Sequence, residues 1–431
     1  MEEYLWVSEK IRVLIEEEWM KLFEKLYKII KNPELFLIYR RKFWREFKLF
    51  DFDYSFLKGY SFPPKSICLI LTERCNLKCL MCDIGQRNVQ NSSHSTFPLA
   101  ESIGKGGEML TLNDWKTLID DIAKKRWDPL VLLTGTEPFL YPHLLQLIEY
   151  IVAKNLRLHI TTNGTLLSRH AGQLVDLCKK PDFISITISL DGIGEVHDKI
   201  RGIKGTFDKA IEGLKKINDK KREYGKIWPA VSIAYTISNF NYRNMREFVQ
   251  WFQEHDLDIE SITFSHLWFK DSAIVEKHNK KYGDVFFVKQ ENIAGLNISE
   301  IDMDFVHNEL HAIKKIYAKS PFSIFEQPRL TYEEAQKYYS KTTELVFYNR
   351  CLAPWRNVSV TPRGEVIVSP MCFDYPIGNV KNNYFSHIWN DVPLRNFRRK
   401  LKKVGFYPAC VRCCLLFDSR PKYYKIKEFI K

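Results

Sequence analysis

The stretch Ser66-Ile-Cys-Leu-Ile-Leu-Thr-Glu-Arg-Cys75-Asn-Leu-Lys-Cys79-Leu-Met-Cys82 joins a short apolar run to three cysteines with the spacing Cys-x3-Cys-x2-Cys. The apolar run predicts a β-strand, so the thiols lie on the loop that follows it. Three thiolates on one loop can hold three irons of a cubane 4Fe-4S cluster and leave the fourth iron open for chemistry. Zinc is the alternative, although a closed zinc site takes four ligands.

Further along the chain, short β-branched runs alternate with helix-length amphipathic stretches. Strands are predicted at 67–71, 130–134, 157–161, 183–189, 230–237 and 261–265, with helices at 113–126, 142–154, 165–178, 206–222 and 241–256. Repeated βα units predict an α/β fold with a parallel sheet, and six strands fit a partial (β/α)6 barrel. Active-site residues of parallel barrels lie at the carboxyl ends of the strands.

Polar motifs follow the predicted strands in chain order: Gly135-Thr-Glu137-Pro, Thr161-Thr-Asn163-Gly, Ser189-Leu-Asp191-Gly and Ile237-Ser-Asn239. Together with the cysteine loop they resemble the radical SAM superfamily, with Thr136 replacing a glycine of its GGEP element. The resemblance implies a radical SAM barrel whose 4Fe-4S cluster is held by Cys75, Cys79 and Cys82. It also implies that S-adenosylmethionine binds the open iron and is cleaved to a 5′-deoxyadenosyl radical, which takes hydrogen from an unactivated C–H bond.

The same resemblance assigns cofactor-binding roles. A zwitterionic cofactor needs a carboxylate near its ammonium and a cation near its carboxylate. Glu137 is expected to supply the first and Arg201 the second, while Ser189 is placed to bond the carboxylate or ribose. The remaining expected cofactor contacts are Met81 at the adenine, Gly135 beside Glu137, and Asn163 and Ile237 at their strand ends.

A second set of cysteines, Cys351, Cys372, Cys410 and Cys413, has the pattern Cys-x20-Cys-x37-Cys-x2-Cys, and the first two flank a predicted hairpin at 357–369. The surrounding sequence resembles the SPASM module and its shortened form, twitch. That resemblance implies one auxiliary 4Fe-4S cluster that accepts or relays an electron, for two clusters in all. A structural zinc ribbon remains the alternative, because four such cysteines equally suit zinc.

Two further residues are catalytic candidates. Cys414 lies beside the second set and either donates hydrogen to a substrate radical or is a small buried residue. His266 follows the sixth strand and by position points toward the barrel mouth, where it would bond substrate.

The chain divides into five predicted segments. Residues 1–62 form an N-terminal helical extension with a basic face, which either contacts a membrane surface or large anionic substrate or caps the next domain. The barrel spans 63–270, and a helical linking subdomain without strong strands spans 271–345. A small α+β auxiliary-cluster domain (346–417) and a basic tail (418–431) complete the chain.

Composition limits the location and partners of the protein. With 65 Lys and Arg against 52 Asp and Glu, the net charge of the 431 residues is +13, which favours anionic partners. No run approaches the roughly 18 to 20 apolar residues of a membrane span, and the acidic start is not a signal peptide. A cytoplasmic location is predicted, and nucleic acid is an unlikely partner because charge alone is non-specific.

The expected reaction is hydrogen abstraction followed by one-electron oxidation of a small polyol or carbohydrate, with the auxiliary cluster as electron acceptor. A reducing partner such as flavodoxin or ferredoxin is implied. Modification of a ribosomally made peptide and epimerisation with Cys414 as hydrogen donor are the alternatives. A metal-stabilised binding protein without catalysis is the competing class.

Overall fold

The structure is a computed structural model that describes residues 52–82, 84–85, 108–288, 296–346, 350–368 and 375–417. The chain forms two compact units, 63–419 and a second made of 1–62 with 420–431. In the second unit the described residues form helix α3 (Phe52–Phe56) and the turn after it, where Ser61 Oγ donates to Asp53 Oδ2 at 2.6 Å. Most of the predicted N-terminal extension and the basic tail lie outside the described residues.

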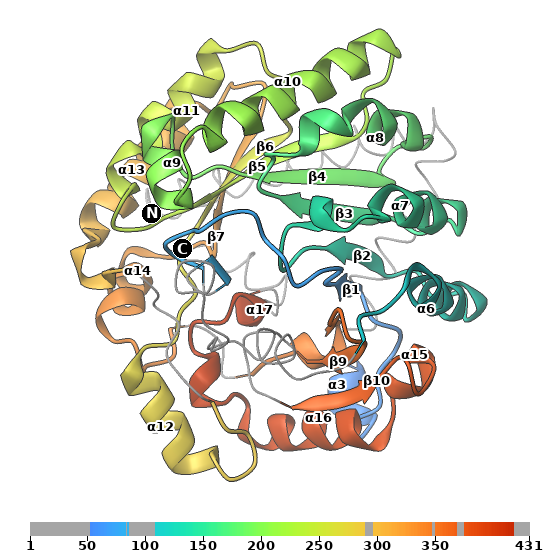
Figure 1. The fold of residues 1–431 in the computed structure, drawn as a ribbon. Coiled ribbons are helices and arrows are strands. Elements are labelled where there is room, and N and C mark those ends of the chain that lie inside the picture. The colour runs from blue at the N-terminus through green and yellow to red at the C-terminus, as the bar shows by residue number, and fades with distance from the viewer. Residues whose placement is uncertain are drawn as a thin grey trace, which may run out of the picture. The chain divides into compact units, whose positions relative to one another are not determined.

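The larger unit is built on one ten-stranded sheet in the order β10-β9-β8-β1-β2-β3-β4-β5-β6-β7 (Figure 1). Strands β8 and β1 to β7 run parallel to one another. Strand β9 pairs antiparallel with both β8 and β10. Strands β1 to β6 form the predicted partial barrel. The strands are β1 (Ser66–Leu69), β2 (Leu130–Leu133), β3 (Leu158–Thr162), β4 (Ile184–Ser189), β5 (Ala230–Thr236), β6 (Ser261–Ser265), β7 (Ser323–Gln327), β8 (Asn357–Val360), β9 (Glu365–Ile367) and β10 (Pro376–Asn379).

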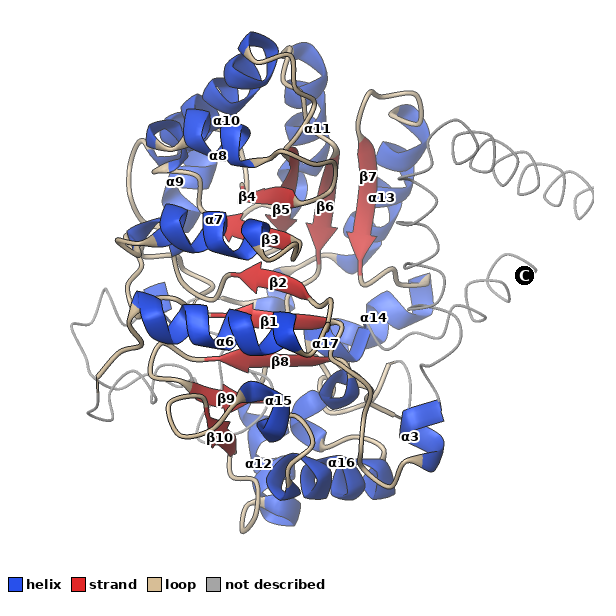
Figure 2. Cartoon of the chain, turned by 90° about the vertical axis from the view of Figure 1, so that its right-hand side faces the viewer, coloured by secondary structure: helices blue, strands red, loops and turns tan. Residues whose placement is uncertain are grey.

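Helices cover the outer face of the barrel strands, as Figures 1 and 2 show. Several begin at side chains that bond the first-turn amides; α6 starts with a capping box between Thr111 and Asp114, and α14 with one between Thr331 and Glu334. The helices of this unit are α6 (Leu112–Lys124), α7 (Leu144–Ala153), α8 (Ala171–Leu177), α9 (Glu195–Arg201), α10 (Thr206–Glu223), α11 (Met245–Glu254), α12 (Ser272–Tyr282), α13 (Met303–Ile316), α14 (Tyr332–Ser340), α15 (Phe385–Ile388), α16 (Val392–Val404) and α17 (Cys414–Phe417).

The two faces of the barrel strands differ in polarity. Residues that alternate along each strand are buried and apolar, for example Ile184, Ile186 and Ile188 of β4. The positions between them are mostly half-buried, and in β4 they carry hydroxyls at Ser185, Thr187 and Ser189. A parallel sheet covered on both faces is normally apolar on both, so the polar face is the side suited to a polar ligand.

The prediction that 271–345 lacks strong strands is wrong. Residues Ser323–Gln327 form β7, which pairs in parallel with β6 as a seventh barrel strand. The sequence Ser-Ile-Phe-Glu-Gln gave little signal because β7 is an edge strand, and its side chains alternate between exposed and half-buried. Strand prediction depends on buried apolar runs, and residues 323–327 do not form one.

The C-terminal hairpin extends the same sheet. Strand β8 pairs in parallel with β1, with Cys68 opposite Ser359, and β9 folds back on β8 across the turn Thr361-Pro-Arg-Gly364. The predicted hairpin is present, and it joins the barrel directly. No helix in the described ranges is long and apolar enough to cross a membrane.

Candidate active site and auxiliary cysteine site

The three-cysteine loop follows β1 and is anchored from both sides. Cys79 is buried, while Cys75 and Cys82 are half-buried. Burial, with a smaller contribution from charge on Cys79, Glu137 and Cys82, raises the pKa of Cys75 to about 12. Cys75 and Cys82 pack against the same buried pair, Ile70 and Ile84, and Cys79 lies between them on the loop. A donor set of three neighbouring thiols fits a 4Fe-4S cluster with one open iron, whose binding would drive their ionisation.

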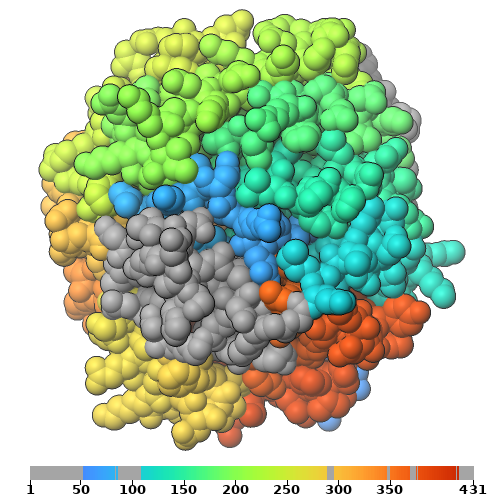
Figure 3. Space-filling view, in the orientation of Figure 1, coloured from blue at the N-terminus to red at the C-terminus, as the bar shows by residue number. Residues whose placement is uncertain are grey.

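One edge of this loop is open to solvent. Arg74 and Lys78 are exposed. Figure 3 shows blue atoms from this part of the chain at the surface, between the green and cyan segments. The loop is thus held by the barrel and exposed to solvent at Arg74 and Lys78.

The Gly135-Thr-Glu137-Pro motif turns sharply at the end of β2. Gly135 has φ +101°, and a Cβ there would lie 2.9 Å from Ile70 Cγ1, so a side chain would be both strained and crowded. Thr136 Oγ1 donates to the carbonyl of Thr72 at 2.8 Å. The motif is therefore tied to the start of the cysteine loop.

Glu137 is the buried carboxylate of this site. It accepts hydrogen bonds from Thr162 Oγ1 (2.8 Å), Asn163 N (2.9 Å) and Phe139 N (3.1 Å). Burial raises the pKa of Glu137 to about 6, against the opposing effect of these donors. Glu137 is thus ionised at neutral pH and able to meet an ammonium group.

Asn163 connects β3 to the cysteine loop. Its Nδ2 donates to Asn76 Oδ1 at 2.8 Å, and Asn76 Nδ2 donates in turn to Thr165 Oγ1 at 2.9 Å. The sequence motifs predicted Asn163 but not Asn76, which lies between Cys75 and Leu77 and gave no signal of its own. Its position directly after a predicted ligand was the only indication.

The segment after β4 brings Arg201 to the cysteine loop. Arg201 Nη2 lies 2.5 Å from Asp191 Oδ2, and its Nη1 donates to Cys79 Sγ at 3.8 Å. Both Arg201 and Asp191 are buried. The predicted cation is therefore in the site, but it faces a carboxylate and a cysteine sulfur of the protein.

The other predicted cofactor contacts lie at the same edge of the sheet. Ser189 ends β4 opposite Ala234 and is half-buried. Ile237 follows β5, is buried, and donates its N–H to the carbonyl of Ser265 at 2.9 Å. Met81 is half-buried on the cysteine loop. Their roles toward the cofactor remain predictions.

His266 lies at the end of β6 but bonds within the protein. Its Nδ1 is 3.2 Å from Tyr339 Oη and its Nε2 is 3.3 Å from Glu326 Oε1. Glu326 also pairs with Lys314. Burial raises the pKa of Glu326, but its bonds to His266 and Lys314 outweigh burial and bring it to about 2. Both ring nitrogens of His266 thus have partners within the protein. Contact of His266 with substrate stays a prediction.

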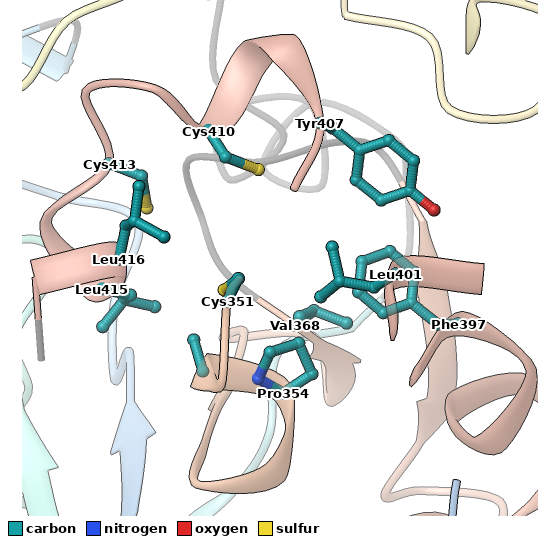
Figure 4. A pocket seen from close by; sticks show the side chains of 11 residues that line it. Cys351, Pro354, Val368, Phe397, Leu401, Tyr407, Cys410, Cys413, Leu415 and Leu416 are labelled. Carbon is teal, nitrogen blue, oxygen red and sulfur yellow. The ribbon is translucent and has the colours of Figure 1, made fainter. Parts of the chain in front are cut away.

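The second cysteine site is formed around one pocket. Cys351, Cys410 and Cys413 line it together with apolar side chains, and Figure 4 shows their three sulfur atoms around the same cavity. Burial raises the pKa of Cys351, and charge on Cys410 and Cys413 would raise it further. Cys372 lies outside the described residues, and of Cys414 only the backbone, at the start of α17, is described.

A cluster suits this arrangement of sulfurs. In the described part of the chain, no three His, Cys, Asp or Glu side chains are grouped as ligands of a single ion. The three cysteines nonetheless share one buried pocket, and a cubane spreads its ligand sulfurs farther apart than a single ion does. The residues present therefore fit an auxiliary iron-sulfur centre.

Two contacts that the sequence did not predict join this site to the barrel. Arg412, between Cys410 and Cys413, is buried and donates to four carbonyls near the end of α14, at Lys337 (3.2 Å), Tyr338 (2.7 Å), Lys341 (2.9 Å) and Glu344 (2.8 Å).

In the hairpin turn, Arg363 Nε lies 2.8 Å from Glu73 Oε1, two residues before Cys75.

Comparisons with known proteins agree with this geometry. A model of the radical SAM superfamily matches residues 69–252, and a model of the SPASM iron-sulfur cluster-binding domain matches residues 351–414. Fe-coproporphyrin III synthase of Methanosarcina barkeri is 25% identical over 359 residues, which cover 80% of this chain and 79% of that protein.

Two other similarities differ in reach. The antilisterial bacteriocin subtilosin biosynthesis protein AlbA of Bacillus subtilis is 24% identical over 335 residues, and the match spans 76% of this chain but only 60% of AlbA. The crystal structure of Streptococcus suis SuiB has a TM-score of 0.54 at 15% identity, covering 83% of this chain and 73% of SuiB. SuiB thus shares the fold.

Proposed function

The chain is a radical SAM enzyme with a SPASM domain, and from that premise we propose that it oxidises a C–H bond of an anionic substrate in two one-electron steps. When bound, S-adenosylmethionine would supply the radical that removes one hydrogen atom from the substrate. Cys351, Cys410 and Cys413 would hold the centre that accepts one electron from the substrate. A reducing partner such as flavodoxin or ferredoxin would supply the electron that reduces the first cluster for cleavage of the cofactor. The substrate is oxidised by two electrons in total.

The protein's own residues hold and orient the reacting groups. When bound, the first cluster and S-adenosylmethionine supply the radical that removes hydrogen. Cys75, Cys79 and Cys82 would hold that cluster, and the ionised Glu137 would receive the ammonium of the cofactor. Thr162 and Asn163 fix Glu137 by their hydrogen bonds, so the carboxylate is pre-oriented before the cofactor binds.

The observation that carries the proposal is the continuity of the sheet between the two cysteine sites. Because β8 pairs with β1, the SPASM hairpin extends the barrel sheet next to the strand that precedes the first cysteine loop. The Arg363–Glu73 ion pair joins the hairpin turn to that loop a second time. A second redox centre held this rigidly beside the barrel supports the role of electron acceptor.

A coproporphyrin-like tetrapyrrole is the substrate class we favour. Its carboxylate side chains suit a chain with net charge +13. The similarity to Fe-coproporphyrin III synthase extends over about four-fifths of both proteins. The predicted polyol substrate would undergo the same two steps, but none of the relatives described above is named for a polyol, and it stays a prediction.

A peptide is the second candidate substrate. AlbA is named for biosynthesis of a bacteriocin, and its similarity to this chain is almost as high. The shorter coverage of AlbA, 60% of its length, weakens the transfer of its substrate class. Both candidates keep the same radical chemistry and differ only in what occupies the open face of the barrel.

The test is formation of 5′-deoxyadenosine by the anaerobically reconstituted protein with S-adenosylmethionine and a strong reductant. Addition of coproporphyrin III or its iron complex should stimulate this reaction and consume the porphyrin, as followed by mass spectrometry. A Cys75→Ala/Cys79→Ala/Cys82→Ala variant is the control and should form none. Cofactor cleavage that no tetrapyrrole alters would refute the substrate class, and its absence from cluster-loaded protein would refute the reaction.

A further inference from the structure

The guanidinium of Arg201 lies against a cysteine of the first cluster loop. Its Nη1 donates to Cys79 Sγ at 3.8 Å, and its Nη2 pairs with Asp191 at 2.5 Å. Arg201 is 9% exposed and Asp191 is fully buried. A buried cation with one carboxylate partner is thus aimed at a ligand sulfur.

Several contacts keep Asp191 in place. Asp191 Oδ1 accepts from Thr236 N at 2.8 Å, its carbonyl accepts from Asn241 Nδ2 at 2.9 Å, and its own N–H donates to His197 Nδ1 at 3.1 Å. Asn241 and His197 therefore hold the main chain of Asp191, and its carboxylate cannot turn away without breaking its bond to β5. It fixes the orientation of Arg201 in turn.

The cysteine loop is also bonded to the end of α9. The N–H groups of Lys78 and Leu80 donate to the carbonyls of Arg201 (3.1 Å) and Ile200 (2.9 Å). Gly202 follows with φ +73°, and a Cβ at this position would collide with the backbone of Lys78. Main chain and side chain of Arg201 thus hold the same turn of the loop.

This geometry has an electrostatic consequence. A hydrogen bond to a ligand sulfur and a nearby positive charge both stabilise the more negative, reduced state of an iron-sulfur cluster. The carboxylate of Asp191 opposes this effect. Because both groups are buried, solvent screens neither of them effectively.

We propose that the Asp191–Arg201 pair is a positioning device that sets the reduction potential of the first cluster through the hydrogen bond to Cys79 Sγ. This role differs from the expected contact of Arg201 with the cofactor carboxylate. It rests on the radical SAM assignment and not on the choice of substrate. The pair acts through Cys79, so its effect is present before S-adenosylmethionine binds.

The experiment is an EPR-monitored redox titration of reconstituted holoenzyme without S-adenosylmethionine. The signal that changes when the cofactor is added afterwards identifies the first cluster. The variants are Arg201→Met, Arg201→Lys and Asp191→Asn. Arg246→Met is the matched control, since it removes another arginine that pairs with a carboxylate, Glu309 (2.6 Å), at a half-exposed site on α11.

Arg201→Met should lower the reduction equilibrium constant at least tenfold, which for one electron is about 59 mV toward more negative potential. Arg201→Lys should shift it less, and Asp191→Asn should shift it the opposite way, because the cation is then uncompensated. Arg246→Met should keep the wild-type potential.

Wild-type potentials in both Arg201 variants, with weakened cofactor binding, would overturn the proposal in favour of the cofactor-carboxylate role. A negative shift in Asp191→Asn equal to that of Arg201→Met would also overturn it, because general loss of packing would explain both. If Arg201→Met retains no iron, Arg201→Lys and Asp191→Asn decide the question by the same criteria.

Discussion

Replacing Arg412 by Met should detach the auxiliary cysteine turn from the barrel. The guanidinium is buried and donates to four carbonyls near the end of α14, at 2.7 to 3.2 Å. Two of these carbonyls also accept from main-chain amides, because Lys341 N donates to Lys337 O at 3.0 Å and Glu344 N donates to Lys341 O at 2.9 Å. Carbonyls near a helix end often lack an intrahelical donor, and Arg412 donates to those of Tyr338 and Glu344.

The magnitude follows from this count of acceptors. The carbonyls of Lys337 and Lys341 keep their main-chain donors, so the variant removes the Arg412 donor chiefly from Tyr338 and Glu344. A hydrogen bond to a charged group contributes about 1.5 kcal/mol or more, so the loss of these two costs about 3 kcal/mol. Met fills much of the volume and removes the cost of burying a cation, which offsets part of the loss. We expect the free energy of unfolding to fall by about 2 kcal/mol.

The assay combines urea unfolding, followed by tryptophan fluorescence, with iron and sulfide per chain after reconstitution. Since Arg412 lies between two ligand cysteines, Cys410 and Cys413, the variant should also lose about half of its iron, that is, one of two clusters. Arg246→Met is the control and should lose less than about 1 kcal/mol, as an exposed ion pair does. Wild-type stability and iron content in Arg412→Met would refute the reasoning.

Four further outcomes are expected. S-adenosylmethionine affinity, measured by equilibrium dialysis, should fall below pH about 6, where Glu137 takes up its proton, and Glu137→Gln should weaken binding above that pH; a pH-independent affinity would contradict this. Because the folded-state pKa of Glu137 lies above its ordinary value of 4.5, its contribution to stability should fall by about 2 kcal/mol as pH rises from about 4.5 to 6, measured as urea midpoints. Gly202→Ala should lower the iron content of the first cluster by displacing Lys78, whereas Gly205→Ala, with a similar φ of +78° but open space around it, should not; equal losses would point to backbone strain alone. Cys414→Ala should retain substrate turnover, whereas loss of turnover with 5′-deoxyadenosine still formed would favour epimerisation.

The barrel strands were predictable because a buried parallel strand is a run of β-branched residues. Residues 261–265 and 130–133 stand out for this reason, and their structures match the predictions within a residue. The edge strand β7 has no buried face of this kind and was missed. The pairing of β8 with β1 joins residues nearly 300 positions apart, and no local pattern encodes it.

The site divides in the same way. Cysteine spacing and the Gly-x-Glu-Pro motif are local, so the ligands and Glu137 were predictable from the chain alone. The partners that fix them are distant in sequence. Asn76 reaches Asn163 and Arg201 reaches Cys79 only because parallel strands of the barrel end at the same edge of the sheet. Sequence reasoning identified Arg201 as a cation of the site but could not tell which anion it meets.

Arg201 and Arg412 are both buried arginines beside cluster cysteines, yet their partners give them different tasks. Arg201 pairs with a carboxylate and touches a sulfur, so its charge bears on the electrons of the first cluster. Arg412 meets only carbonyls among its hydrogen-bond acceptors described above, so it acts on the position of the second cysteine turn. Loss of Arg201 should therefore shift a potential more than stability, and loss of Arg412 should do the reverse. If both variants changed both properties equally, the two cysteine sites would have to be regarded as one cooperative unit.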